Sequence, residues 1–170
     1  DSPGTAAAVD ATPFAVSVAA SVSSYNSEDI VGNVVFDYAL TINFTNNTVQ
    51  YGSNEAIAIT NTGAAPVSGV TVTATTYGVT IASTLSEKIK YNLTGTLSGT
   101  LTVTSSAAYQ LYLNGVTINA SAGPALDLES SQKVYIVAAS GTTSTLNDSL
   151  ARSMTMKAAV YGKGAMIFSG

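Results

Sequence analysis

The sequence contains no cysteine, no tryptophan and no histidine. The lack of cysteine excludes a disulfide scaffold, a thiolate metal site and a cysteine nucleophile. The lack of tryptophan leaves any aromatic stacking to nine tyrosines and four phenylalanines. No apolar run reaches the ~18 to 20 residues of a membrane-spanning helix, so we expect no membrane insertion.

Charge is also scarce. Charged residues make up 9% of the chain, against roughly 25% in an ordinary soluble domain. The net charge is −4 and basic residues form no cluster. Nucleic acid and anionic membrane surfaces are therefore poor candidate partners, because both require concentrated positive charge. Low charge also weakens the usual protection of β-proteins against edge-to-edge and end-to-end association.

What the chain does contain is a series of short segments with apolar residues at alternate positions, which predicts β-strands with one buried face. Apolar pairs recur at a step of about 23 to 28 residues, the length of one coil of a three-sided solenoid. Leu101/Val103 recurs as Leu126/Leu128, Leu111/Leu113 recurs as Val134/Ile136, and Val116/Ile118 recurs near Leu146. The sequence therefore predicts an all-β solenoid.

The first part of the chain differs from this pattern. Residues 1–13 are small and polar with two prolines, which favours an extended arm. Residues 14–22 and 30–38 alternate and predict strands, or one strand and a short helix. We expect an arm with leading strands over residues 1–38 and the solenoid over residues 39–170, with an inserted loop at 149–157. The chain starts at Asp1 without a basic leader, which suggests a removed signal peptide and a secreted protein, extracellular or at the cell surface.

The second half of the chain resembles a known family. The runs YNLTGTLSGTLTV, LYLNGVTINASAGPALDL, KVYIVAASGTTSTLND and KGAMIFSG stand in the order and spacing of a bacterial carbohydrate-binding domain related in shape to pectate lyases. The resemblance covers about residues 42–170. It implies a right-handed parallel β-helix, an extracellular and non-catalytic role, and affinity for acidic plant-type polysaccharides, often with calcium.

Candidate carbohydrate-binding residues come from two patterns. Tyr112 and Tyr135 alternate with apolar residues and are predicted to point outward from one sheet at matching heights, where their rings could stack on a sugar or simply pack between coils. Asp127 and Glu129 are predicted to share an outward face, as glycan or calcium ligands. The simpler interpretation of these two acids is a solvated pair near Lys133.

No catalytic residue is predicted. A polysaccharide lyase of this shape would need a basic residue in its groove, and the only arginine, Arg152, falls in the predicted loop. We therefore expect no enzyme. Ser149, within Asp148-Ser149-Leu150, resembles a short acceptor motif for O-linked glycans.

The end of the last coil leads to an assembly hypothesis. No segment after Ile167 could cover the last coil, so another subunit could stack on it and form an open filament. The residues predicted to carry this contact are Phe14, Val16, Val18, Met166, Ile167 and Phe168. A self-associating extracellular fibre is the first functional hypothesis from the sequence, and a polysaccharide-binding module is the alternative.

Overall fold

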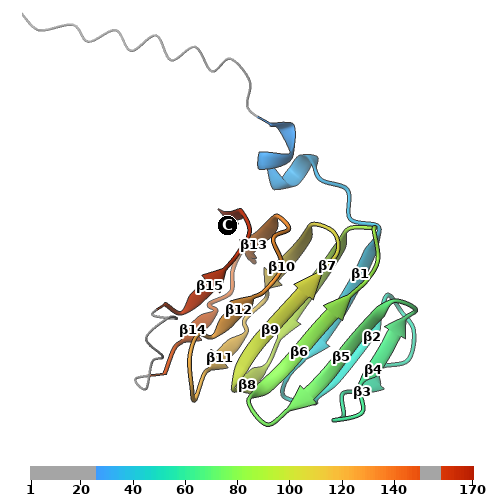
Figure 1. Ribbon diagram of the computed structural model, residues 1–170, viewed down its shortest axis with the longest axis vertical. Coiled ribbons are helices and arrows are strands. Elements are labelled where there is room, and N and C mark those ends of the chain that lie inside the picture. The colour runs from blue at the N-terminus through green and yellow to red at the C-terminus, as the bar shows by residue number, and fades with distance from the viewer. Residues whose placement is uncertain (1–25, 150–157) are drawn as a thin grey trace, which may run out of the picture.

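The computed structural model describes residues 26–149 and 158–170, which form an all-β structure with two short 3-10 helices (Figure 1). The predicted all-β class is confirmed.

The strands form a seven-stranded, a six-stranded and a three-stranded sheet. In spatial order the seven-stranded sheet contains β16 (Met166–Ser169), β13 (Val134–Ala138), β10 (Tyr109–Leu113), β7 (Ile89–Thr94), β1 (Tyr38–Asn43), β2 (Thr48–Tyr51) and β3 (Ile57–Ala58). The six-stranded sheet contains β15 (Val160–Gly162), β12 (Leu126–Leu128), β9 (Thr100–Ser105), β6 (Gly78–Ser83), β5 (Val70–Thr75) and β4 (Ala64–Val67). The three-stranded sheet contains β14 (Thr145–Asn147), β11 (Thr117–Asn119) and β8 (Thr96–Ser98).

From β7 onward, consecutive strands belong to the three sheets in turn. Within each sheet, every strand from this part of the chain pairs parallel with the next one. Side-chain hydrogen bonds between neighbouring passages join residues that are 23, 24 or 28 positions apart. These separations match the recurrence predicted from the apolar pairs.

The earlier strands depart from the predicted solenoid pattern, because β1–β2–β3 and β4–β5–β6 pair antiparallel and make the two larger sheets mixed. Tight turns cause this reversal. Asn47 has a φ of 52° and Gly69 a φ of 86°, conformations that short connections between antiparallel strands require. The Asn43 side chain accepts a hydrogen bond from the Asn46 N–H and fixes the first turn.

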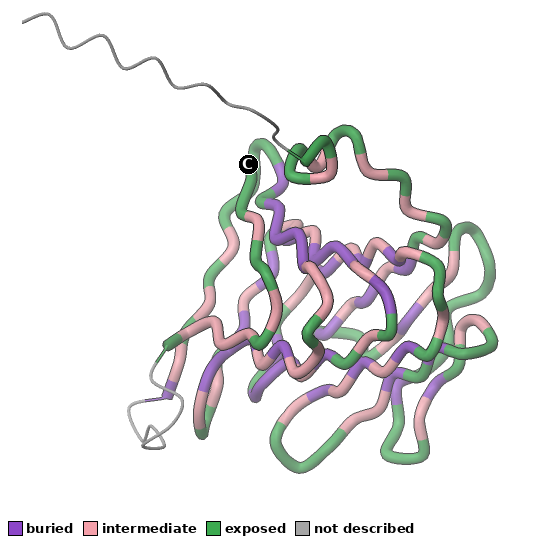
Figure 2. Tube along the Cα trace, turned by 45° about the horizontal axis from the view of Figure 1, so that its top comes forward, coloured by how far each residue is buried: buried purple, intermediate pink, exposed green. Residues whose placement is uncertain are grey.

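A single apolar core lies between the sheets and receives side chains from all three of them. Burial alternates strictly along β6 and β7, so each strand presents one face to the core and the other to solvent (Figure 2). Tyr91 and Tyr109 point inward, and their rings meet edge to face at 6.3 Å. Burial raises the pKa of the Tyr109 hydroxyl to about 12.

The alternating residues 30–38 do not form a strand until Tyr38. Two 3-10 helices, η1 (Ser27–Asp29) and η2 (Val31–Asn33), precede it. Asn26 caps the first by accepting from the Glu28 N–H, and the Asn33 amide donates to the Ser27 carbonyl. These local side-chain hydrogen bonds compete with strand pairing. We call residues 26–36 the strap.

Several predictions fall on residues 1–25 and 150–157, outside the described residues. They include the extended arm, Phe14, Val16, Val18, Arg152 and most of the loop expected at 149–157. Within the described ranges, no helix is long and apolar enough to cross a membrane.

Substitution of Gly78 tests how closely the backbones of β6 and β9 approach each other. Its φ is 143°, and a Cβ added there would lie 2.0 Å from the Thr100 carbonyl oxygen. We expect Gly78→Ala to lower the free energy of unfolding by about 2 kcal/mol or more, from backbone strain and overpacking together. Urea denaturation would measure it. The matched control is Gly32→Ala, where an added Cβ meets nothing within 4 Å, and equal effects of the two substitutions would contradict the close approach.

Candidate functional site

The outer face of the seven-stranded sheet carries a row of polar and aromatic side chains in register. Thr41 in β1 lies opposite Gln50 in β2 and Asn92 in β7. Asn92 in turn lies opposite Tyr112 in β10. We call Gln50, Thr41, Asn92 and Tyr112 the outer row. It arises because inward positions on these strands are apolar, which leaves the alternate positions outside.

The outer row offers hydrogen-bonding groups beside an aromatic ring. The Asn92 amide nitrogen lies 3.5 Å from the Thr41 hydroxyl, while its oxygen is buried and has no partner among the described residues. The Lys90 ammonium sits 4.2 Å from the centroid of the Tyr112 ring, a cation–π contact. The face therefore combines an amide, a hydroxyl and a ring with a polar end.

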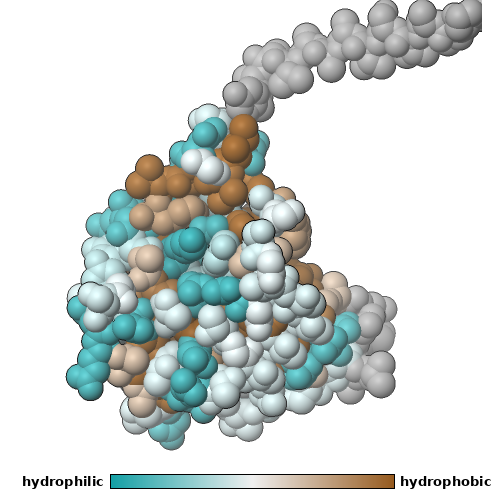
Figure 3. All heavy atoms as spheres, turned by 180° about the vertical axis from the view of Figure 1, so that it is seen from behind, coloured by the Kyte–Doolittle hydropathy of each residue, from teal (hydrophilic) through white to brown (hydrophobic). Residues whose placement is uncertain are grey.

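Figure 3 views the molecule from behind, where polar and weakly polar side chains spread over the strands. Apolar side chains gather near the strap, in which Ile30 and Val35 are exposed. The strap thus carries exposed apolar side chains beside the charged Glu28 and Asp29.

The outer face of the six-stranded sheet carries a second row, made of Thr73, Thr80, Thr102, Asp127 and Tyr161 in register. Burial, reinforced by the neighbouring Glu129 carboxyl, raises the pKa of Asp127 to about 6. The Glu129 carboxylate pairs with Lys163, and this hydrogen bond lowers the Glu129 pKa. Lys133, expected beside these acids, instead pairs with Asp29 of the strap.

The predicted carbohydrate-binding residues are therefore divided between two faces. Tyr112 and Tyr135 do share the outer face of the seven-stranded sheet, but Tyr135 lies opposite Gln110 and Tyr112 opposite Val137, so the two tyrosines are diagonal and not at matching heights. The Tyr135 ring is fully buried, and its hydroxyl donates to the Glu28 carbonyl of the strap. Its role in glycan binding stays a prediction.

The other predicted sites lie apart from both rows. Ser149 is 9% exposed and its hydroxyl donates to the Ser121 carbonyl at 2.8 Å, so attachment of a glycan there would require local opening. Met166 and Phe168 lie opposite Val134 and Ile136 in the last strand of the seven-stranded sheet. They are 38% and 63% exposed.

Sequence reasoning did not identify Gln50, Thr41, Asn92 or Lys90 as site residues. A signal was present in the run IKYNLT, where Lys90 and Asn92 alternate with buried Ile89, Tyr91 and Leu93. Alternation indicates an outward position, but it cannot tell which outward residues of distant strands become neighbours.

A comparison with protein families identifies the family of this chain. A family model described as "Carbohydrate-binding domain-containing protein" matches residues 68–170. The chain belongs to this family. No curated protein and no solved structure matches it. The part matched to the carbohydrate-binding family includes Asn92, Tyr112 and Asp127, whereas the strap, Thr41 and Gln50 lie before it.

Calcium, which the family resemblance implied, can be tested against the geometry. Calcium takes six to eight oxygen ligands. Asp127 and Glu129 supply two carboxylates, one of which is engaged by Lys163. Among the described residues no group of three or more potential metal ligands comes together. Two carboxylates fall short of this number of ligands, so calcium binding by Asp127 and Glu129 is not supported by the geometry and stays a prediction.

The raised pKa of Asp127 gives a pH-dependent effect on stability. Its folded-state pKa of about 6 exceeds the ordinary aspartate value of 3.8, so the folded state binds this proton more tightly than the unfolded state. Stability is therefore lost as pH rises from about 4 to about 6, and the ionised carboxylate opposes folding above that window. We expect Asp127→Asn to raise Tm by a few degrees at pH 7.5 and by less at pH 4.

Thermal unfolding followed by circular dichroism at both pH values would measure this difference. The control is Glu55→Gln, at an exposed acid in the β2–β3 loop, which should shift Tm equally little at each pH. A stabilisation by Asp127→Asn that did not depend on pH would show that the carboxylate charge is not responsible.

Proposed function

We propose that this chain is a non-catalytic module that binds a polysaccharide along the outer face of the seven-stranded sheet. The observation that carries the proposal is the outer row, in which Thr41, Asn92 and Tyr112 come into register from three different strands. Membership of a carbohydrate-binding family supports the ligand class.

The spacing of the row suits a repeating ligand. Neighbouring strands of a sheet lie roughly 4.8 Å apart, which is close to the length of one sugar ring. A glycan lying across the strands therefore meets a hydroxyl, an amide or the ring at each step. The Thr41 hydroxyl and the Asn92 amide nitrogen, both on half-buried residues, can hydrogen-bond to sugar hydroxyls. The Tyr112 ring can pack against the apolar face of a sugar.

We further propose that the three sheets are the sides of a parallel β-helix. The parallel pairing from β7 onward and the sequence separations of 23, 24 and 28 between hydrogen-bonded residues support this architecture. A right-handed coil is expected because crossovers between parallel strands are almost always right-handed. We place the module outside the cell, where a polysaccharide ligand would be met.

Substitution of outer-row residues tests the binding proposal. We expect Tyr112→Ala to weaken binding of plant cell-wall polysaccharide about tenfold, since each 1.4 kcal/mol corresponds to a factor of ten and a packed ring contributes on that order. Asn92→Ala should weaken it by a smaller factor. Affinity gel electrophoresis with xyloglucan, pectin and soluble cellulose derivatives would measure the change.

Tyr77→Ala is the matched control, because Tyr77 is 70% exposed and lies in the turn between β5 and β6, away from the outer row. It should bind as the wild type does. The proposed face is wrong if the wild type binds none of these glycans. It is also wrong if all three variants bind with the same affinity as the wild type.

A second candidate function is self-association through the open edge of the last strand, β16. Met166 and Phe168 continue the inward-facing columns of Val134 and Ile136, yet they are partly exposed because β16 is the edge strand of this sheet among the described residues. Contacts of this kind between unlike surfaces of identical chains do not close and so generate filaments. We infer that a second copy could cover this edge, with Phe14, Val16 and Val18 as its contributing residues.

Phe168→Ser tests this second candidate. If Phe168 is buried between copies, the substitution should shift the protein from oligomer to monomer in sedimentation velocity at micromolar concentration. Val35→Ser is the control, since Val35 is 77% exposed but lies in the strap. A wild-type chain that sediments only as a monomer would rule the assembly out.

A further inference from the structure

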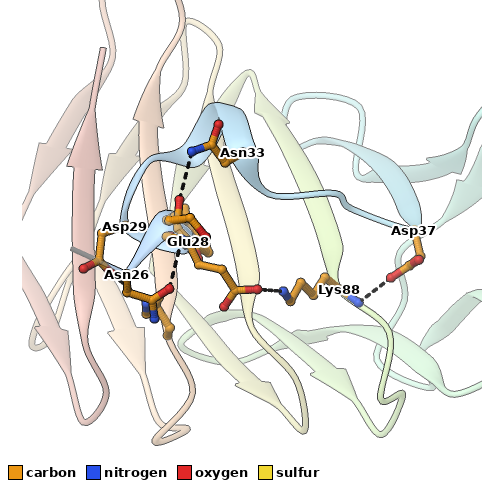
Figure 4. A network of polar contacts seen from close by, with 9 residues as sticks. Asn26, Glu28, Asp29, Asn33, Asp37 and Lys88 are labelled. Atoms are coloured by element: carbon orange, nitrogen blue, oxygen red, sulfur yellow. Dashed lines mark hydrogen bonds and ion pairs between the residues drawn. The ribbon is translucent and has the colours of Figure 1, made fainter. Parts of the chain in front are cut away.

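The strap lies on the same sheet as the outer row and is held there by two ion pairs, of which Figure 4 shows the one between Glu28 and Lys88. The Glu28 carboxylate lies 2.5 Å from the Lys88 ammonium, at the start of β7. The Asp29 carboxylate lies 2.7 Å from the Lys133 ammonium, directly before β13. Directly after the strap, the Asp37 carboxylate accepts a hydrogen bond from the Lys88 backbone N–H.

Between these two lysines the strap covers Tyr135. The Tyr135 hydroxyl donates to the Glu28 carbonyl at 2.6 Å, and its ring meets Phe36 edge to face at 5.9 Å. Tyr135 lies opposite Gln110, which is two positions before Tyr112 on β10. The strap therefore occupies the row directly beside the outer row.

The strap is held by partly exposed ion pairs and by its contacts with the buried Tyr135. None of the residues in η1 and η2 is buried, and the side chains of Glu28 and Asp29 are 47% and 53% exposed. Exposed ion pairs contribute little to stability and are screened by salt. The core cluster contains no residue of the strap, so the strap can lift while the sheets remain folded.

We propose that the strap is an intramolecular competitor of the glycan, in which Glu28 and Asp29 occupy lysines that a carboxylate-bearing polysaccharide engages once the strap lifts. This inference rests on the proposed polysaccharide-binding function. The exposed surface then extends from the outer row to Tyr135, with Lys88 and Lys133 at its two sides. A glycan with carboxylates replaces both ion pairs, whereas a neutral glycan leaves the two lysines without partners.

Loosening the strap should therefore strengthen binding. We expect Glu28→Gln and Phe36→Ala each to bind oligogalacturonate about fivefold more tightly than the wild type, because apparent affinity scales with the fraction of molecules in the open form. Glu55→Gln makes the same charge change outside the strap and should leave the affinity near that of the wild type. Titration calorimetry at low salt would measure the constants.

The proposed role of Lys88 and Lys133 can be tested by comparing a charged ligand with a neutral one. The wild type should prefer oligogalacturonate to its fully methyl-esterified form. The Lys88→Gln/Lys133→Gln double variant also frees the strap, but it should lose this preference. Retention of the full preference by the double variant would overturn the assignment of the lysines.

Displacement of the strap can also be observed directly by cleavage with a glutamate-specific protease. If the ligand lifts the strap, it should accelerate cleavage after Glu28 without accelerating cleavage after Glu55. If the ligand slows cleavage after Glu28, the strap closes over the glycan and the competitor proposal is overturned.

The outcomes separate this inference from the function on which it depends. Glycan binding that requires Tyr112 but is unchanged by Glu28→Gln and Phe36→Ala overturns the strap proposal alone. An absence of binding by the wild type and by every strap variant overturns both.

Discussion

The register of parallel strand pairing is the constraint on which the rest of this structure depends. Val134 lies opposite Tyr109, and Tyr109 opposite Ile89, so one column of buried side chains runs through three passages of the chain. Because side chains alternate between the two faces of a strand, the same register also aligns Asn92 with Tyr112 on the outside. A slip of one residue would send the apolar column to solvent and break up the outer row at the same time. Core stability and the functional surface are thus set by one geometric relation.

The scarcity of charge has its clearest effect on the outer faces. Where ordinary sheets carry lysines and glutamates, this chain places threonine, asparagine, glutamine and tyrosine, so its surface can make hydrogen bonds to a neutral, hydroxyl-rich polymer. Each of four lysines on these faces has a different contact. Lys88 and Lys133 bind the strap, Lys90 lies over the Tyr112 ring, and Lys163 pairs with Glu129. Each of these positions marks a part of the surface where a charged ligand would be distinguished from a neutral one.

The strap and the core differ in how strongly they are held. The core is an extended cluster of buried apolar side chains, whose burial is the main favourable contribution to folding. The strap relies on exposed ion pairs, one hydroxyl contact from Tyr135 and one ring contact. In the proposed competition, the strap covers Tyr135 beside the outer row and exchanges with a ligand, since none of the strap residues belongs to the core cluster.

The sequence by itself determined the all-β class, the recurrence of strands and the alternation that places Tyr112, Asp127 and Glu129 outward. These properties follow from local periodicity, which depends only on near neighbours along the chain. The tertiary structure alone decided which outward residues meet: it put Tyr112 beside Asn92 and Lys90, and Asp127 on a different sheet with Lys163 as its neighbour. It also covered Tyr135 with the strap and turned β1 to β6 into antiparallel pairs. Those outcomes depend on tight turns and on contacts between residues that are distant in the sequence, such as Lys88 with Glu28. Alternation within one strand carries no information about such contacts.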